Sequence, residues 1–359
     1  MFLRMGTALS AETRLASLNG RVPTIATLCS HSSLQIFHGA RIEGFPTLGI
    51  CVGPPPKFYD AFPLARPDEF VSVPNVKELP QLTDQLRDDG AILVPHGSFV
   101  EYLGPEAFSS LDVPVFGNRA VLGWESDRRK ERDWLESAGV TMPKLYEDPQ
   151  EIRGPVIVKY YGAKGGKGFF LAKNREALDD FRPSGPYVIQ EYVLGTRYYM
   201  HFFYSPIAEG GYRLRDGSLE LLGMDRRDEA NIDELYKLGS AEELHRSGLR
   251  PTFVVTGNVP VVLRESLLPK AFEAAGRIVE RSIELFGGMV GPFCLEGIMT
   301  EDLEFKVFEI STRIVAGTNL FISGSPYSDL IEPGLSTGRR IAREVAHARA
   351  TGRLAEVLS

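Results

Sequence analysis

The sequence predicts an α/β protein of three lobes, the first of which carries a parallel sheet. Short apolar runs alternate with helical patterns over roughly the first third of the chain, which is typical of βαβ units. Longer strand-like runs dominate the second half, and a chain of 359 residues exceeds one ordinary core. We expect a Rossmann-like lobe over 1–122, a small α+β lobe over 123–195 and a larger α+β lobe over 196–359.

The first lobe is expected to alternate strands with helices. Two helical patterns, SLQIFHGARIEG and VKELPQLTDQLRDDG, separate runs that are rich in β-branched and apolar residues. These runs predict strands at 24–28, 45–52, 91–95 and 114–118. No glycine fingerprint follows the first strand, so a dinucleotide-binding dehydrogenase is disfavoured.

Polar side chains follow two of the predicted strands directly. SHSS (30–33) comes after the first strand and PHGS (95–98) after the third. The carboxyl ends of parallel strands meet at one edge of the sheet, where α/β proteins bind ligands. Ser30 alone could be a helix cap, and each histidine alone could be structural. Together, His31, Ser32, His96 and Ser98 predict a phosphate site of hydroxyl, imidazolium and helix N–H groups.

The second lobe contains the most unusual stretch, VIVKYYGAKGGKGFFLA at 156–172. Its apolar flanks predict a hairpin, and its tip is rich in glycine and lysine, a composition that suits phosphate. It is not a P-loop, because Gly168 follows Lys167 where Ser or Thr would be needed. Lys159 lies inside the first strand, where an ammonium group is disfavoured unless an anion meets it.

The third lobe is expected to combine long strands with an amphipathic helix at LLPKAFEAAGRIVERSIELF. Two adjacent runs, GPFCLEGIMT and LEFKVFEIS, predict a hairpin. If its turn is even-numbered around Asp302 and Leu303, Glu296 and Glu309 lie directly opposite each other and repel. A divalent cation between them would reverse the sign of that interaction, and oxygen ligands favour Mg²⁺ or Mn²⁺. Two exposed strand glutamates are the structural alternative.

Composition limits the partners of the chain. A net charge of −7 favours a small phosphorylated ligand that is held locally, and argues against a nucleic-acid surface. No apolar run approaches the ~20 residues of a membrane span, and no signal-peptide core is visible. We therefore expect a cytoplasmic protein without membrane or nucleic-acid partners. Three well-separated cysteines suggest buried small side chains, without disulfides or a zinc site.

The glycine-rich hairpin, a small lobe ending in QEYV and paired strands ending in an E-x-[NS]-x-R pattern resemble the ATP-grasp superfamily. Longer strings narrow the resemblance. IATLCSHSSLQIFHGARIEGF, VPHGSFVEY, FGNRAVLGWES, LLGMDRRDEANID, TGNVPVVLRESLLP and GPFCLEGIMT are similar to the archaeal formate-dependent FAICAR synthetases of purine biosynthesis, the PurP type. This resemblance implies an ATP-dependent ligase that converts AICAR, formate and ATP to FAICAR, ADP and phosphate through formyl phosphate. It also implies a homo-oligomer.

The resemblance assigns roles to individual residues. Glu296 and Glu309 would bind the metal, and Arg313 would stabilise the transferring phosphoryl group. AICAR would be bound by His31, Ser98 and Asn258. ATP would be bound by Lys159, Gly165, Gly166, Lys167, Gly168, Gln190, Glu191, Tyr192, Val193 and Glu229.

Three positions depart from the resemblance. Ser311 stands where the superfamily commonly has Asn, and Val315 and Ala316 replace Asp and Gly in the segment after Arg313. These departures leave open a paralogue that joins a different small acid and amine. A nucleotide-binding regulator without turnover is a third reading, although it would require a disabled metal pair.

Overall fold

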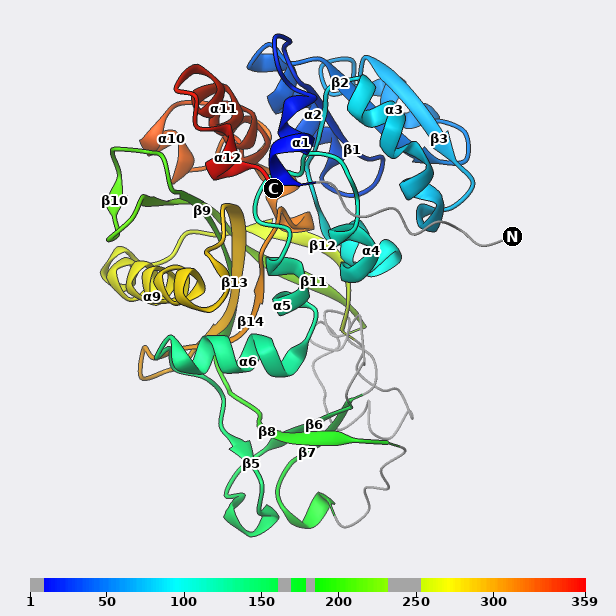
Figure 1. Cartoon of the computed structure of the whole chain (residues 1–359). Coiled ribbons are helices and arrows are strands. Elements are labelled where there is room, and N and C mark those ends of the chain that lie inside the picture. Colours follow the sequence, from blue (N-terminus) through cyan, green and yellow to red (C-terminus); the bar gives the residue numbers. More distant parts are fainter. Residues whose placement is uncertain (1–9, 161–168, 179–184, 232–252) are drawn as a thin grey trace.

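The computed structural model describes residues 10–160, 169–178, 185–231 and 253–359, and its strands form three sheets (Figure 1). The first sheet lies at one end of the molecule and the smallest at the other, with the largest sheet between them. In the described part of the chain, no helix is long and apolar enough to span a bilayer.

The first sheet has the order β3-β2-β1-β4, and all of its strands are parallel. Three of the four predicted strands are confirmed. The fourth, 114–118, makes only single bridges, including Leu93 with Val115, so the prediction of a full strand there is wrong. The strand β3 was missed because it is an edge strand in which only Val73 is buried. The strands are β1 (Thr24–Leu28), β2 (Thr47–Val52), β3 (Glu69–Val73) and β4 (Ala91–Leu93).

Helices and short turns connect these strands. The pattern predicted as one helix over 76–90 is divided, because Pro80 offers no backbone N–H and the chain before Thr83 forms a 3-10 turn. The elements are α1 (Ala11–Ala16), α2 (Ser33–Ile42), η1 (Lys57–Ala61), η2 (Val76–Leu82), α3 (Thr83–Asp88), η3 (Phe99–Leu103) and α4 (Pro105–Ser109).

Two helices, α5 (Val121–Glu125) and α6 (Arg128–Ser137), lead from the first sheet to the smallest one (Figure 1). Asp127 caps α6 by accepting from the backbone N–H groups of Arg129 and Lys130. The small sheet is antiparallel, with the order β5-β8-β6-β7. Its strands are β5 (Leu145–Tyr146), β6 (Val156–Tyr160), β7 (Phe169–Ala172) and β8 (Tyr187–Glu191). Two short 3-10 helices, η4 (Pro149–Glu151) and η5 (Glu176–Leu178), lie between these strands in sequence.

The largest sheet is antiparallel and has the order β10-β11-β9-β13-β14, with β12 also paired to β11. The long amphipathic helix α9 (Leu268–Phe286) is confirmed and buries its alanine-rich face. The strands are β9 (Thr196–Ser205), β10 (Tyr212–Arg213), β11 (Ser218–Asn231), β12 (Phe253–Pro260), β13 (Gly291–Met299) and β14 (Phe305–Ser311). The remaining elements are η6 (Glu265–Leu267), η7 (Ala316–Phe321), α10 (Ser328–Ile331), α11 (Thr337–Ala350) and α12 (Leu354–Val357).

The helix α11 packs against α2 of the first lobe, although the two are far apart in sequence (Figure 1). The helices interlock through glycines: a Cβ at Gly39 would overlap the backbone of Arg339, and one at Gly338 would overlap the carbonyl group of Gln35. Gln35 also accepts a hydrogen bond from the backbone N–H of Gly338, at 2.9 Å, through its Oε1 atom. The end of the chain therefore fixes the helix that follows the SHSS turn.

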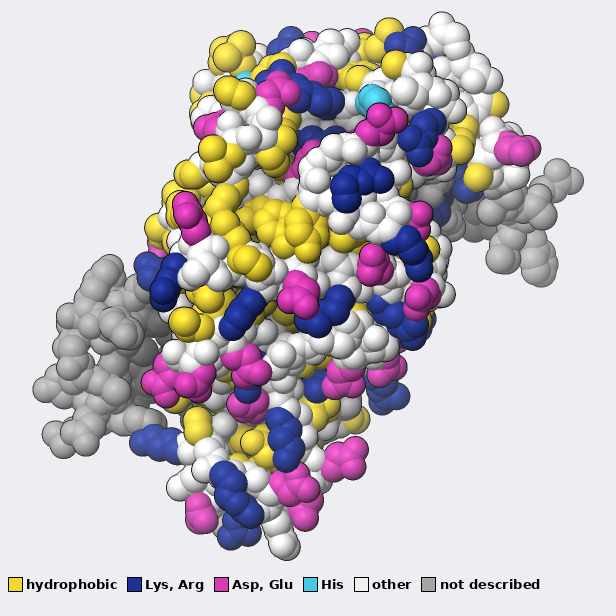
Figure 2. All heavy atoms as spheres, turned by 90° about the vertical axis from the view of Figure 1, so that its left-hand side faces the viewer, with side chains coloured by type: hydrophobic (Ala, Val, Ile, Leu, Met, Phe, Trp, Pro, Cys, Tyr) yellow, Lys and Arg dark blue, Asp and Glu magenta, His cyan; other side chains and the backbone are white. Residues whose placement is uncertain are grey.

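One face of the molecule carries a patch of apolar side chains over β10, α9 and α10 (Figure 2). Tyr212, Phe272 and Ile331 line a shallow groove there, and the neighbouring Leu330 is 84% exposed. The cysteines are free thiols, of which Cys51 and Cys294 are buried as predicted. Cys29 is only partly buried.

Candidate functional site

The structure brings Glu296 of β13 and Glu309 of β14 directly opposite each other, as predicted. The reason differs from the one predicted. The turn is not even-numbered: Thr300 pairs with Glu304 around three residues, and Leu303 takes the left-handed conformation with φ of 59°. A β-bulge then places one extra residue, Phe308, in β14 and restores the alignment of the two glutamates.

The two acids of this pair have different surroundings. The Glu296 side chain is buried and its residue is only 5% exposed, whereas Glu309 is exposed. Burial, together with the negative charge of Glu309, raises the pKa of Glu296 to about 7. Arg227 offsets part of this repulsion, because its Nη2 atom lies 3.1 Å from Oε1 of Glu296. Because the pKa of Glu296 is still raised, Arg227 compensates only part of the cost of burial and repulsion.

Lys159 of β6 lies close to this acid pair. Its Nζ donates to Oε1 of Gln190 at 3.3 Å, and the ammonium group lies 5.9 Å from the ring centre of Phe308. Burial lowers the pKa of Lys159, while the charge of Glu309 acts in the opposite direction. Thus the predicted ATP-binding lysine and the predicted metal ligands occupy one electrostatic environment, although they belong to different sheets.

The other predicted ATP-binding residues are described to different extents. Glu191 is held by Lys306, whose Nζ lies 2.8 Å from its Oε1, and this contact helps to lower the pKa of Glu191 despite partial burial. Tyr192 is partly buried and Val193 is buried. Glu229 lies in β11, where its backbone pairs with Val255. The predicted phosphate-loop residues Gly165, Gly166, Lys167 and Gly168 lie outside the described residues.

The two polar turns of the first lobe, 30–33 and 95–98, meet as predicted; we call them the histidine turns. The Oγ atoms of Ser30 and Ser98 lie 2.7 Å apart, and the rings of His31 and His96 meet edge to face at 4.8 Å between centroids. Ser32, rather than Ser30, stands at the N-cap of α2, in the left-handed conformation and without a side-chain cap.

The two histidines of these turns have different surroundings. His96 is fully buried, and its ring nitrogens are both used: Nε2 donates to the Leu28 carbonyl, and Nδ1 accepts from the Ser98 amide. Burial lowers the pKa of His96 to about 3. The prediction that His96 serves a ligand as an imidazolium is therefore wrong, and the ring is structural. His31 keeps an exposed side, although desolvation and the charge of Arg313 lower its pKa.

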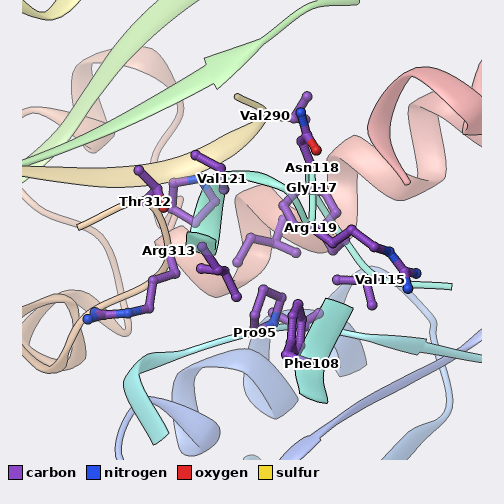
Figure 3. A pocket seen from close by; sticks show the side chains of 15 residues that line it. Pro95, Phe108, Val115, Gly117, Asn118, Arg119, Val121, Val290, Thr312 and Arg313 are labelled. Atoms are coloured by element: carbon purple, nitrogen blue, oxygen red, sulfur yellow. The ribbon is translucent and has the colours of Figure 1, made fainter. Parts of the chain in front are cut away.

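Arg313 joins the histidine turns to the acid pair. It is the second residue after β14, and its Cζ atom would lie 3.5 Å from a Cβ built on Gly97, beside the His31 ring. Its Nη2 atom is 2.9 Å from Oε1 of Glu125, while its buried Nε atom has no hydrogen-bond partner in the described part of the chain. The side chain runs away from a small cavity beneath it, which holds about 10 Å³, too little for a nucleotide (Figure 3).

Asn258 of β12 lies beside Arg227 of β11 in the register of the two strands. Its Oδ1 atom is buried and lacks a hydrogen-bond partner among the described residues. Orphaned polar atoms of this kind are uncommon in proteins and often mark places where a ligand supplies the missing group. Two such atoms, on Asn258 and Arg313, belong to residues that were predicted to contact substrates.

Three charged residues of the site were missed at the sequence level. Arg227 holds Glu296, while Glu125 and Glu131 contact the strand that carries Glu309. Burial, reinforced by the charge of Glu309, raises the pKa of Glu131 well above its usual range. The segment WESDRRKERDWLESAG has the pattern of a charged helix, and nothing in that pattern distinguishes a buried glutamate from a solvated one.

The acid pair suits a divalent cation that is shared with a ligand. Within the described ranges, no three His, Cys, Asp or Glu side chains converge into a complete metal centre. The pair offers carboxylate oxygens, the donors that Mg²⁺ and Mn²⁺ prefer, and Mg²⁺ usually takes only one or two carboxylates plus substrate phosphates. Burial and the charge of Glu309 both raise the pKa of Glu296, and a bound cation would oppose both effects.

Comparison with known proteins agrees with this geometry. Two family models match, a protein of unknown function (DUF1246) over residues 25–146 and a domain of unknown function (DUF1297) over residues 181–359. A Methanothrix thermoacetophila protein named 5-formaminoimidazole-4-carboxamide-1-(beta)-D-ribofuranosyl 5'-monophosphate synthetase is 64% identical, over 98% of this chain and 100% of the relative. The chain belongs to this synthetase family. The synthetase of that name from Pyrococcus horikoshii is 47% identical over 93% of this chain and 99% of its own.

Solved structures confirm the predicted fold class, with the ATP-grasp architecture. An IMP biosynthesis protein PurP from Thermococcus kodakaraensis matches with a TM-score of 0.72 and 34% identity, over 93% of this chain and 100% of its own. The N5-carboxyaminoimidazole ribonucleotide synthetase purK, solved as an ADP complex, matches with a TM-score of 0.63 at 14% identity, over 90% of this chain and 76% of its own. At that identity, the second likeness concerns the fold alone.

Proposed function

We propose that this chain is an ATP-dependent ligase that formylates AICAR with formate, giving FAICAR, ADP and phosphate. The observation that carries the proposal is the position of Arg313. It lies between a pair of opposed acids with a nearby buried lysine on one side and two polar turns of a parallel sheet on the other. Such an arrangement could serve two phosphorylated ligands that meet at one arginine, and membership of the synthetase family supports these substrates.

On the nucleotide side, Lys159 would pair with ATP phosphates. Its ammonium is partly buried and has its pKa lowered, and among the described residues its hydrogen-bond partner is a neutral glutamine oxygen at 3.3 Å. A charged partner would therefore strengthen its interactions considerably. Together with Lys159, the other ATP-binding residues proposed are Gly165, Gly166, Lys167, Gly168, Gln190, Glu191, Tyr192, Val193 and Glu229.

Glu296 and Glu309 would hold Mg²⁺ or Mn²⁺ together with phosphate oxygens. When bound, such a cation neutralises charge on the phosphates that develops during transfer. Arg227 would keep Glu296 oriented, because its guanidinium also lies over the Tyr199 ring at 3.6 Å. The Ser311 residue is buried, so its departure from the superfamily pattern leaves the two glutamates as the main protein ligands.

On the acceptor side, His31, Ser98 and Asn258 would bind AICAR. The phosphate group would meet the Ser30 and Ser98 hydroxyl groups and the start of α2, and its negative charge would raise the pKa of His31. Asn258 would use its carbonyl oxygen, which lacks a partner among the described residues. His96 would not touch the ligand but would hold the Ser98 backbone.

The reaction would proceed in two displacements. A formate oxygen attacks the γ-phosphorus of ATP and ADP leaves, giving formyl phosphate. The AICAR amine then attacks the formyl carbon, loses a proton and expels inorganic phosphate. The positive charge of Arg313 would stabilise the transferring phosphoryl group at the boundary between the two sides of the site.

A coupled assay of ADP release tests the proposal, with AICAR, formate and ATP each left out in turn. We expect ADP production to require all three. Full turnover without AICAR or formate would overturn the proposed substrates, and turnover with another small acid and amine would identify a paralogue. The cytoplasmic location and the homo-oligomeric state stay predictions.

A further inference from the structure

The outer edge of β14 makes a set of contacts that the proposed reaction does not use. This strand is the last in its sheet, so its outward N–H groups have no neighbouring strand to bond. They are satisfied by the segment before the small sheet. The Val307 amide donates to the Thr141 carbonyl at 2.9 Å, and the Ile310 amide donates to Oε1 of Glu131 at 2.8 Å. The Thr312 amide donates to Oε2 of Glu125, also at 2.8 Å.

The spacing of these amides is irregular because of the bulge at Phe308. Outward amides recur at every second residue of a regular strand, yet here the interval from Val307 to Ile310 is three. The extra residue shifts the alternation by one, and Glu131 accepts from the first outward amide after the shift. Without the bulge, the register would place Phe308 opposite Glu296 and turn Glu309 to the other face of the sheet.

Glu125 holds the two residues that follow the strand. Its Oε2 atom accepts from both the amide and the hydroxyl of Thr312, the latter at 2.7 Å, and its Oε1 atom pairs with Arg313. The Glu125 side chain is only 7% exposed. One buried carboxylate therefore fixes the backbone beneath the arginine and the direction of its guanidinium group.

We propose that Glu125 and Glu131 are positioning residues for this site. Glu131 stabilises the bulged register that sets Glu309 opposite Glu296, and Glu125 aims Arg313. Neither acid would touch the substrates: Glu131 acts through β14, and Glu125 acts through the two residues that follow it. The inference rests on the proposed function for the roles of Glu309 and Arg313, but its first consequence, cation binding beside a nucleotide, can be measured without turnover.

Two substitutions at Glu131 distinguish the effect of its hydrogen bond on cation binding from the effect of its packing. Glu131→Gln keeps an oxygen that accepts from Ile310, whereas Glu131→Met fills the same space without an acceptor. In the presence of a non-hydrolysable ATP analogue, Mn²⁺ binding is titrated by electron paramagnetic resonance. We expect the Met variant to bind Mn²⁺ about tenfold more weakly, and the Gln variant to stay within about threefold of the unchanged protein.

A matched control is Glu136→Gln on the same helix, whose half-exposed carboxylate pairs with Arg132 away from the site. It should leave Mn²⁺ binding unchanged. Equal affinity in the Met variant and the unchanged protein would overturn the role of Glu131. If the Met variant does not fold, Glu131→Asp draws the acceptor back by one methylene group and is titrated in the same way, with the same criterion.

Glu125→Gln tests the second half of the proposal. It keeps an acceptor for Thr312 but removes the charge that pairs with Arg313, so kcat should fall about a hundredfold while KM for ATP changes by less than about threefold. A kcat within a factor of two would overturn the role of Glu125. If the unchanged protein binds Mn²⁺ with the nucleotide yet makes no FAICAR, the proposed function fails, while the Glu131 titration still decides the positioning role.

Discussion

The histidine turns and the acid pair are built in opposite ways. In the turns, a buried neutral ring makes two hydrogen bonds to the backbone, and neighbouring hydroxyl groups bond each other. In the acid pair, a buried carboxylate faces an exposed one, and their mutual repulsion helps to raise the pKa of Glu296 to about 7. The groups of the first region thus satisfy one another, whereas the second region keeps a repulsion between two carboxylates that a bound cation would offset.

This contrast implies that substitutions in the two regions affect stability and activity differently. Substitutions in the turns should disturb folding first, because the groups there satisfy one another. Substitutions in the acid pair should abolish chemistry at little cost in stability, because the unliganded pair is already unfavourable. The following predictions begin with the largest expected effect.

Glu309→Gln should lower turnover about a thousandfold, because it removes one of two anionic cation ligands. The free energy of unfolding of the unliganded protein should stay within about 1 kcal/mol or rise, since the repulsion with Glu296 disappears. ADP release and urea unfolding measure the two effects. Glu304→Gln, an exposed residue of the same hairpin, is the control. A clear loss of stability without loss of turnover would reverse the contrast.

Gly338→Ala should destabilise the protein by about 3 kcal/mol, because the new methyl group overlaps the backbone of Gln35 in α2. Since α2 begins at the first histidine turn, KM for AICAR should also rise, while KM for ATP stays constant. Gly123→Ala lies in α5 with open space around it and should be neutral or slightly stabilising. Equal stability of the two variants in thermal unfolding would show that the helices do not interlock.

Lys159→Met should raise KM for ATP by roughly ten- to a hundredfold, as expected for the loss of a charge-assisted contact worth about 1.5–3 kcal/mol. Stability should hold or increase, because the ammonium is partly desolvated and its hydrogen-bond partner in the described part of the chain is a neutral glutamine at 3.3 Å. Steady-state kinetics at saturating AICAR and formate measure the effect. Lys173→Met, an exposed lysine just beyond β7, serves for comparison. An unchanged KM would remove Lys159 from the nucleotide site.

The smallest effect concerns pH. His96 has a folded pKa of about 3, below its ordinary value near 6.5, so the unfolded chain binds an extra proton between these values. Stability is therefore lost as the pH falls through that window. The stability advantage of the unchanged protein over His96→Gln should shrink by up to about 1.4 kcal/mol per pH unit between pH 6 and 4. A constant difference in urea unfolding would mean that His96 is not neutral and buried.

The sequence predicted the site best where the positions of polar residues follow from the order of the strands. Residues 30–33 and 95–98 meet because both follow parallel strands, and this consequence of topology can be predicted without coordinates. Whether a given side chain is free to bind a ligand was harder to predict. His96 matched His31 in position, yet both nitrogens of its ring are hydrogen-bonded, one to the Leu28 carbonyl and the other to the Ser98 amide. Only the packing around β1 and β4 reveals this.

For the acid pair, the predicted alignment is correct but the predicted reason for it is not. Its alignment was predicted from an even-numbered turn, but the protein combines a three-residue turn with a bulge at Phe308, and the two deviations cancel. Phe308 reads as an ordinary strand residue, so no local signal could have revealed the bulge. Glu125 and Glu131 were missed for a related reason: their acceptors serve a strand edge that is remote in sequence.

The most direct test of the account is the electron density between Glu296 and Glu309 in crystals grown with Mn²⁺ and a non-hydrolysable ATP analogue. We predict an anomalous peak within about 2.0–2.3 Å of an oxygen from each carboxylate, shared with phosphate oxygens. A bound nucleotide with no peak between the two acids, or with Glu309 turned toward solvent, would contradict the claim that a cation balances the pair.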